Sequence, residues 1–407
     1  SNLWERQMAK LLEITGKAIS GEWGQDDDTG TGIPVLRTTN FTNEGFVNYK
    51  NVVTRSISKK NIAEKYLRHG DVIIEKSGGS DKQPVGRVIF FEGEENKYLF
   101  NNFTGLLRVQ NPEEWLPKYV FYALYAYYRN GGTRAFENRT TGLHNLQVDN
   151  YVKSVDIPKL SYRKQQHICE TLDHVRDAVA YRERQLTKLD ELIKARFVEM
   201  FGDLVENPKQ FPCMLLGSIM TVMPQNGLYK PQSAYVQDKF GTPILRIDGF
   251  YNGKVTDFNN LKRLCCTDFE KERYLLVEND IVINRVNSIE YLGKCARISG
   301  LQEDTVFESN MMRFHLDDSK VNSTYITTVL CSQYIYRQIL TRAKKAVNQA
   351  SINQGDVQSL NVVVPPLSLQ NQFADFVAEV DKSKVEVQKA LDQTQLLFDS
   401  LMQQYFG

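Results

Sequence analysis

Residues 32–37 read Gly-Ile-Pro-Val-Leu-Arg, and residues 241–246 read Gly-Thr-Pro-Ile-Leu-Arg. A second motif recurs at the ends of the halves, where Phe201-Gly202 returns as Phe406-Gly407. The offset between copies is 209 residues at the first motif and 205 at the last. Solenoid units run to only a few tens of residues, so this period indicates a duplicated domain pair. Such a chain is expected to do one kind of task at two places, with different targets.

Composition narrows the class of protein. A length of 407 residues predicts two or three domains, and 42% apolar with 24% charged residues is typical of a soluble globular protein. No apolar run reaches the roughly 18 residues of a membrane span, and no secretory leader is visible. The six cysteines show no paired spacing, which favours reduced thiols and a cytoplasmic location. A net charge of +1 is low for a solitary DNA-binding protein, so either DNA is not the partner or another subunit supplies many phosphate contacts.

Both halves have the same internal order. Each begins with about 150 residues of short β-branched and aromatic runs separated by Gly, Asn and Asp. The predicted strands are Val35–Arg37, Asp71–Glu75, Val85–Phe91 and Gly105–Val109 in the first half, and Ile244–Ile247, Asp280–Asn284, Gly293–Ile298 and Met311–Leu316 in the second. Aromatic-rich helices are predicted at Pro117–Arg129 and Thr324–Arg342, and closing strands at Val155–Pro158 and Val362–Pro366. Because the strands and helices do not alternate strictly, each region is predicted to be α+β.

A long helix follows each closing strand. Its apolar positions recur with a 4-3 spacing, in one register in both copies: Ile168, Leu172, Val175, Val179, Arg182, Leu186, Leu189, Ile193, Arg196 and Met200, then Phe373, Val377, Val380, Lys384, Val387, Leu391, Thr394, Phe398, Leu401 and Tyr405. This is the pattern of a coiled-coil seam, and 33 residues make a rod of roughly 50 Å. We expect the two helices to pack as an antiparallel coiled coil with pseudo-twofold symmetry. The alternative is an amphipathic helix lying on the core of its own domain.

Four seam positions are polar or charged, namely Arg182, Arg196, Lys384 and Thr394. Our hypothesis is that they set the register and the antiparallel pairing at some cost in stability. A rod of this length separates two binding regions by about one to one and a half turns of B-DNA. That geometry suits two DNA half-sites, although it would suit two peptide targets equally well.

The residues that open the long helices carry a family resemblance. Pro365-Pro366-Leu367-Ser368-Leu369-Gln370, and its counterpart from Ile157-Pro158 to Gln165, resemble the conserved-region helices of type I restriction–modification DNA specificity (S) subunits. Gly70-Asp71-Val72-Ile73-Ile74 and Asn279-Asp280-Ile281-Val282-Ile283 resemble the target-recognition domains of that family. The resemblance covers essentially the whole chain. The sequence departs from the family pattern in one place, where the first copy carries about two extra residues between Pro158 and Gln165.

The resemblance implies a noncatalytic subunit that binds double-stranded DNA, each recognition domain reading one half of a bipartite site. The helices would set the gap and dock two methyltransferase (M) subunits, which carry S-adenosylmethionine and methylate adenine. A restriction (R) subunit would use ATP and magnesium ion in the full complex, so this chain itself would need no cofactor and no metal. The implied division is residues 1–160 and 204–366 for the recognition domains, and residues 161–203 and 367–407 for the spacer helices.

The motifs of the relevant enzymes are absent from the sequence. There is no Asn-Pro-Pro-Tyr motif for a flipped adenine, no Walker A motif, and no His-Glu-x-x-His or Cys-x-x-Cys motif for zinc. The run Asp71–Lys76 faintly resembles a nuclease carboxylate cluster. However, its counterpart, Asp280–Arg285, has Asn284 in place of the second acid. We therefore interpret both runs as strands with a polar end.

Two segments in each half are candidates for DNA contact, because Arg and Lys bind phosphate and guanine while Asn and Gln pair with adenine. One precedes the closing strand: Arg134, Arg139, Thr140, Thr141 and Asn145, matched by Arg342, Lys344, Lys345, Asn348, Gln349 and Ser351. The other follows the Asp-Val-Ile-Ile strand: Lys76, Ser77, Gly78 and Gly79, matched by Arg285 and Asn287. A solvated helix face with a polar turn explains the first segment as well, and a flexible hairpin turn the second.

Arg37 and Arg246 occupy equivalent places at a strand end, where each either contacts phosphate or closes an ion pair. Two rival functions remain open beside DNA recognition by a type I subunit. One is a two-headed scaffold that binds proteins, and the other is the specificity part of another methylation or phage-defence system. A nuclease or methyltransferase activity within this chain is a further alternative that the missing motifs disfavour.

Overall fold

The computed structural model describes residues 7–58, 62–140, 143–237 and 240–407. The chain divides into two compact units of similar size. Unit 1 comprises Ser1–Arg184 together with Gln388–Gly407, and unit 2 comprises Gln185–Val387. Among the described residues, no helix combines the length and apolarity that a membrane span requires.

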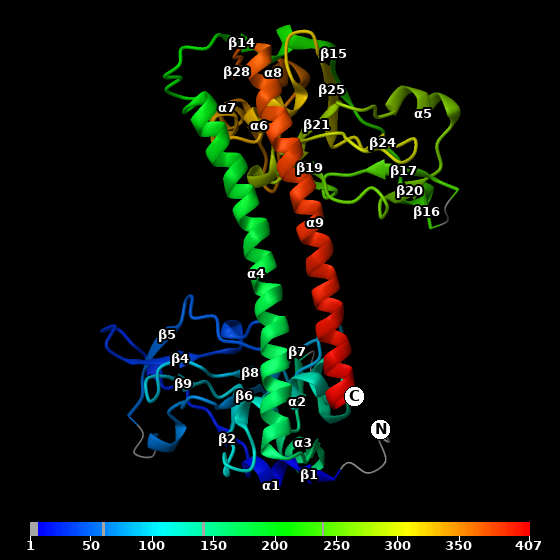
Figure 1. Cartoon of the computed structure of the whole chain (residues 1–407). Coiled ribbons are helices and arrows are strands. Elements are labelled where there is room, and N and C mark those ends of the chain that lie inside the picture. Colours follow the sequence, from blue (N-terminus) through cyan, green and yellow to red (C-terminus); the bar gives the residue numbers. More distant parts are fainter. Residues whose placement is uncertain (1–6, 59–61, 141–142, 238–239) are drawn as a thin grey trace. The chain divides into compact units, whose positions relative to one another are not determined.

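The described part of unit 1 contains four small sheets. Several of their strands are labelled in Figure 1. Their strand orders are β1-β13, β2-β10-β6-β8, β3-β5-β4-β9 and β7-β12-β11. The strands are β1 (Met8–Lys10), β2 (Ile19–Ser20), β3 (Gln25–Asp26), β4 (Ile33–Leu36), β5 (Val53–Ser56), β6 (Val72–Glu75), β7 (Ser77–Gly79), β8 (Val88–Phe90), β9 (Leu99–Phe100), β10 (Thr104–Leu107), β11 (Glu137–Thr140), β12 (Leu143–Leu146) and β13 (Asp156–Pro158). The helices are α1 (Leu11–Thr15), α2 (Pro117–Arg129) and α3 (Val148–Ser154).

Unit 2 repeats this plan, with sheets β14-β28, β15-β25-β21-β23-β19-β18, β16-β20-β17-β24 and β22-β27-β26. The strands are β14 (Cys213–Leu215), β15 (Met220–Asn226), β16 (Tyr235–Val236), β17 (Thr242–Leu245), β18 (Phe250–Tyr251), β19 (Gly253–Val255), β20 (Lys262–Leu264), β21 (Ile281–Asn284), β22 (Val286–Asn287), β23 (Cys295–Arg297), β24 (Val306–Phe307), β25 (Met311–Leu316), β26 (Lys344–Lys345), β27 (Ala350–Ser351) and β28 (Asn361–Val363). The helices are α5 (Asp268–Tyr274), α6 (Ser323–Leu330), α7 (Gln333–Arg342) and α8 (Gln354–Gln358).

The two units share sheet order and pairing sense. In both, the strand of the Gly-x-Pro motif pairs in parallel with a later strand, β4 with β9 and β17 with β24. The described part of unit 2 differs by two added edge strands, β18 and β19. The α+β prediction is confirmed, and each predicted strand overlaps an observed one.

The single helix predicted at Thr324–Arg342 is wrong, because the segment forms α6 and α7. Ser332 interrupts it and accepts a hydrogen bond from the backbone N–H of Ile335, so a second helix begins there. The equivalent helix of unit 1, α2, is continuous and has the predicted bounds.

The long helices α4 (Tyr162–Phe201) and α9 (Leu367–Phe406) have 40 residues each and include the 33-residue seam rows. Both begin at positions related by the offset of 205, and so do β13 and β28, which precede them. The expected insertion of about two residues after Pro158 is therefore wrong. Pro158 corresponds to Val363 and not to Pro365.

Within each unit the two long helices contact each other with opposite chain directions. In unit 1, Leu172 near the start of α4 and Met402 near the end of α9 belong to one core cluster. In unit 2, the rings of Phe197 and Phe373 lie 5.4 Å apart. The first turns of α4 and α9 lie on the core of the domain that precedes each helix, so the alternative of an amphipathic helix on its own domain holds for these turns. The last turns pack on the core of the other half's domain.

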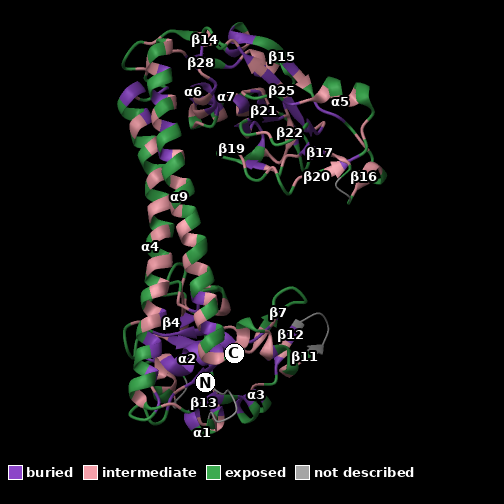
Figure 2. Cartoon of the chain, turned by 45° about the vertical axis from the view of Figure 1, so that its right-hand side comes forward, coloured by how far each residue is buried: buried purple, intermediate pink, exposed green. Residues whose placement is uncertain are grey.

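The middle turns of both helices differ from the ends, because residues 173–196 and 381–397 include no buried side chain (Figure 2). The polar seam positions make specific contacts there. Arg182 Nε donates to Thr394 Oγ1 at 3.0 Å in unit 1, and Lys384 pairs with the Asp190 carboxylate in unit 2. The guanidinium of Arg196 lies over the Phe376 ring. A pairing held by half-buried apolar and polar contacts is weak per turn, so the core contacts at the ends carry most of the stabilisation.

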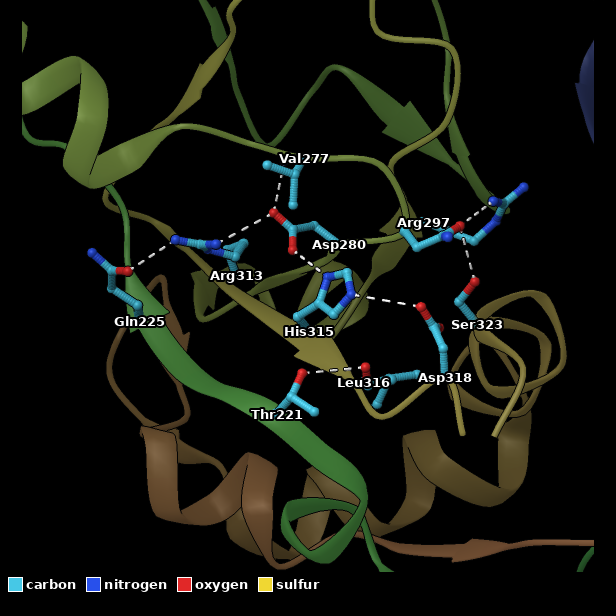
Figure 3. A network of polar contacts seen from close by, with 11 residues as sticks. Thr221, Gln225, Val277, Asp280, Arg297, Arg313, His315, Leu316, Asp318 and Ser323 are labelled. Carbon is cyan, nitrogen blue, oxygen red and sulfur yellow. Dashed lines mark hydrogen bonds and ion pairs between the residues drawn. The ribbon is translucent and has the colours of Figure 1, made fainter. Parts of the chain in front are cut away.

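The runs that resemble a nuclease carboxylate cluster, Asp71–Lys76 and Asp280–Arg285, each contribute an aspartate to a buried ion pair. In unit 1, Arg108 donates from Nε and from a terminal nitrogen to the two carboxylate oxygens of Asp71, at 2.8 and 2.7 Å. In unit 2, the position opposite Asp280 is occupied by His315, whose Nδ1 lies 2.9 Å from Asp280 Oδ1 (Figure 3). Arg313 lies 3.5 Å from the other oxygen of Asp280, which also accepts from the Val277 N–H. These acids are therefore engaged by arginine, histidine and backbone groups, as expected for structural groups.

Burial raises the pKa of Asp280 above its ordinary value of 3.8, despite opposing contributions from Val277, His315 and Arg313. The folded state thus favours the protonated acid. The resulting stabilisation of the folded state is complete below pH 3.8, and it is lost as the pH rises through the raised pKa of Asp280. We expect the urea midpoint of the wild type, relative to Asp280→Asn, to fall as the pH increases above 3.8.

Asp317→Asn supplies a control of opposite sign. Hydrogen bonds from Ser319 and Lys320 lower the pKa of Asp317, so that its stabilisation is lost as the pH falls. Parallel urea midpoints for the wild type and Asp280→Asn across this pH range would contradict the prediction.

Candidate nucleic-acid interface

The structure joins the two candidate segments of each half in one three-stranded sheet. In unit 1, β12 pairs with β11 on one side and with β7 on the other. In unit 2, β27 pairs in the same way with β26 and β22. The segment after the Asp-Val-Ile-Ile strand is therefore a sheet strand, and the alternative of a flexible hairpin turn is wrong for the described residues.

The hairpin of unit 2 is cationic and projects polar side chains. Lys344 pairs with Ser351 and Lys345 with Ala350, and the turn closes where Ala346 N donates to Gln349 O at 2.7 Å. All residues from 344 to 349 are exposed. Residues 342–353 include three basic side chains and no acid. The tip therefore presents Lys, Asn and Gln side chains without a neighbouring carboxylate in this segment, which suits contact with phosphate and base edges.

Val347 at the tip of this hairpin was not singled out from the sequence. Its side chain is 99% exposed, although it is apolar. The base of the hairpin is firmly held, because Ala350 and Ile352 are buried and Ile352 N donates to Arg285 O at 3.0 Å. An apolar side chain on a held polar hairpin can contact a thymine methyl group or wedge between bases. The only signal in the sequence is a lone Val within a polar turn.

The corresponding hairpin of unit 1 has different chemistry. Its strands carry Arg139, Thr140 and Asn145, whereas Thr141 lies outside the described residues. His144 is buried and lies 3.0 Å from Glu137 Oε2, and its other ring nitrogen lies 3.5 Å from Asp81. Acids near the base of this hairpin make it less cationic than its counterpart, so the two units present different surfaces on one scaffold.

The structure explains why glycine occupies two positions of β7, Gly78 and Gly79. A Cβ on Gly79 would lie 2.6 Å from the backbone nitrogen of Val85, and Gly78 has a φ of +131°. The close backbone approach that glycine permits is therefore made to the chain itself at Gly79. Lys76, just before β7, donates to Ser20 Oγ at 2.8 Å, and burial lowers the pKa of Lys76.

The remaining candidates have partners within the protein, and all of them except Asn287 on β22 lie outside the two hairpin sheets. Arg246 Nε lies 3.6 Å from Glu308, an ion-pair distance rather than a hydrogen bond, and Arg37 donates to Asn51 O. Arg342 makes three hydrogen bonds to Ser359 and Gln338. Single contacts are made by Arg134 to Asp81 O and by Arg285 to Ser309 O, and Asn287 Oδ1 accepts from Ser288 N. Arg246 thus closes an ion pair, and these contacts favour a supporting role for Arg37 and Arg342.

Comparison with known protein families and sequences gives a consistent picture. The family model described as type I restriction modification DNA specificity domain matches residues 208–394. A putative type I restriction enzyme MjaX specificity subunit of Methanocaldococcus jannaschii is 30% identical over 196 residues, which are 47% of this chain and 44% of that protein. The match therefore spans less than half of that relative. The type I restriction enzyme EcoKI specificity subunit of Escherichia coli is 24% identical over 399 residues, 92% of this chain and 82% of that protein.

Solved structures share the fold. The S subunit of a type I restriction–modification system from M. genitalium aligns with all of this chain and 97% of its own, with a TM-score of 0.58 and 15% identity. A structure described in work on assembly and conformational transition of the type I R-M system aligns with 100% of this chain and 99% of its own, with a TM-score of 0.57 and 15% identity.

The close packing of β7 predicts that Gly79→Ala will destabilise unit 1, because the new Cβ meets backbone that cannot move aside. We expect a lower thermal midpoint, measured by circular dichroism. Gly105→Ala is the matched control, since a Cβ there makes only ordinary contacts at 3.5 Å or more. Equal midpoints for the two variants would contradict this account of the Gly79 contact.

Proposed function

Since this chain belongs to the type I restriction–modification DNA specificity family, we propose that it is the noncatalytic subunit that selects the DNA sequence. Each unit would read one half of a bipartite site in double-stranded DNA. The observation that carries the proposal is the three-stranded hairpin sheet described in both units, with one strand order and different residues on its strands. Equal scaffolds with unequal surfaces suit two different half-sites.

The long helices support the second part of the proposal. We propose that α4 and α9 form an antiparallel coiled coil with pseudo-twofold symmetry, which sets the gap between half-sites. The opposite chain directions found within each unit support this arrangement. The domain boundaries then fall at residues 1–160, 161–203, 204–366 and 367–407. Large apolar side chains remain exposed on these helices, including Tyr181, Leu192, Val385, Leu396 and Leu397. They suit docking of two M subunits.

The chemistry of the complex is assigned to the partner subunits. S-adenosylmethionine would bind the M subunits, and ATP and magnesium ion the R subunit. The pairing of Asp71 and Glu75 with Arg108 and Arg87 weighs against a nuclease site in this chain, since the four charges neutralise one another. A two-headed protein scaffold remains the alternative function, and it predicts binding that is independent of DNA sequence.

The decisive experiment expresses the chain with the adenine methyltransferase encoded beside it in a host that lacks such systems. Modified adenines are then read by long-read sequencing. We expect methylation at one two-part motif with a fixed gap. No new methylation, with the two proteins shown to associate, would favour the scaffold.

A second prediction concerns the cationic hairpin of unit 2. Lys344→Ala with Lys345→Ala should weaken DNA binding by the methyltransferase complex for all sequences. The double variant should reduce the slope of log K against log salt by about 2, or about one for each lost phosphate contact. Lys188→Ala with Lys382→Ala is the control of equal charge change, on exposed helix positions of the same unit. An unchanged slope in the hairpin variant would remove these lysines from the interface.

A further inference from the structure

A fully buried glutamine stands near the start of each long helix. Gln165 and Gln370 are the fourth residues of α4 and α9, and both are 0% exposed. Their positions differ by the same offset of 205 as the helices themselves. An uncharged polar side chain at such a site is costly unless its amide is fully engaged. The contacts of the two side chains are therefore informative.

Each amide accepts a hydrogen bond from the residue that precedes the aromatic helix of its unit. Leu116 N donates to Gln165 Oε1 at 2.8 Å, and Asn322 N donates to Gln370 Oε1 at 2.9 Å. Leu116 is the N-cap of α2 and Asn322 is the N-cap of α6. The oxygen of the amide thus holds the recognition region at the first turn of its central helix.

The other end of each amide holds the connection to the long helix. Gln165 Nε2 donates to Leu160 O at 2.9 Å, and Gln370 Nε2 donates to Pro365 O at 2.7 Å, in both cases five residues earlier. Gln165 Nε2 also donates to Glu114 O at 2.9 Å. One side chain therefore links the long helix, the segment that leads into it, and the recognition region. Only a group that donates and accepts at once can do so.

A second repeated contact lies beside it. Tyr119 Oη donates to Pro158 O and Tyr325 Oη to Val363 O, both at 2.9 Å, and both rings are fully buried. The aromatic helix is thereby tied to the closing strand in each unit. Apolar packing alone permits small rotations, whereas one directional bond to the long helix and one to the strand before it restrict the orientation of this helix.

We infer that Gln165 and Gln370 are positioning residues that hold each recognition region in one orientation on its long helix, and so fix the gap accepted between half-sites. This inference rests on the proposed function. Gln370→Met and Gln165→Met remove the donor and the acceptor. In these variants the preference for the native gap, over gaps one base pair longer or shorter, should fall roughly tenfold, as the loss of a buried hydrogen bond implies.

Gln370→Glu separates positioning from general destabilisation. A protonated carboxyl can donate to Pro365 O and accept from Asn322 N, whereas a carboxylate can only accept and repels the carbonyl. Gap preference in Gln370→Glu should therefore recover as the pH is lowered, and in Gln370→Met it should not. Binding of the methyltransferase complex to duplexes of three gap lengths is measured between about pH 5.5 and 8, a range that spans a raised buried carboxyl pKa. Gln372→Glu, at an exposed position of the same helix, should behave as wild type.

Amide hydrogen exchange tests the contact without DNA. Gln370→Met should speed exchange in residues 322–325 while the β25 strand stays protected. Unchanged gap preference and unchanged exchange in both Met variants would overturn the inference. Wild-type protein that shows no gap preference at all, but loses protection at residues 322–325 on substitution, would instead refute the proposed function and leave the positioning contact standing.

Discussion

The packing of the ends of the long helices against the unit cores is the constraint on which the remaining structure depends. Phe398 and Met402 of α9 are buried in the core of unit 1, together with Leu172 of α4. Unit 1 is thus completed by the last 20 residues of the chain, about two hundred residues after the rest of it. Burying side chains of this size stabilises each contact by about 1.5–3 kcal/mol, which exceeds what the half-buried middle turns provide.

This arrangement makes each unit a product of both halves of the sequence. In unit 2 the ring of Tyr325 contacts the rings of Phe197 and Phe201 from α4. The ring of Phe373 from α9 packs on Phe201. The recognition regions are therefore carried on helices whose ends are part of their own cores. A region fixed in this way can present a hairpin with little freedom, which lowers the entropy lost when it meets a partner.

Duplication has preserved the scaffold and changed the polar groups placed on it. The ion pair of Glu75 with Arg87 in unit 1 corresponds to Asn284 and Lys294 in unit 2, where Lys294 Nζ lies 3.7 Å from the Tyr251 ring centroid. The Asp71–Arg108 pair corresponds to Asp280 and His315. These exchanges alter charge while the strand pairing persists. Divergence of the two hairpins in sequence therefore did not require a new fold.

The sequence alone determined the features that periodicity and repetition encode, namely the long helices and the duplicated domain plan. The 4-3 spacing predicted both long helices, and the repeated motifs predicted two units of the same α+β plan, because backbone hydrogen bonding and apolar burial impose these periods locally. The resemblance at Gln370 and its neighbours also came from the sequence. The offset after Pro158 and the single helix at residues 324–342 were wrong, since a proline alignment and an aromatic pattern do not reveal strand register or the Ser332 cap.

Only the tertiary structure decided which distant residues meet. Strand β7 joins the β11–β12 hairpin across more than fifty residues, so the sequence could not show that two candidate segments form one surface. It also could not show that Arg342 is occupied by Ser359, that Val347 is exposed, or that Gln165 is buried. Propensity and periodicity report on neighbours along the chain, whereas the partner of a polar group is set by folding of the whole unit.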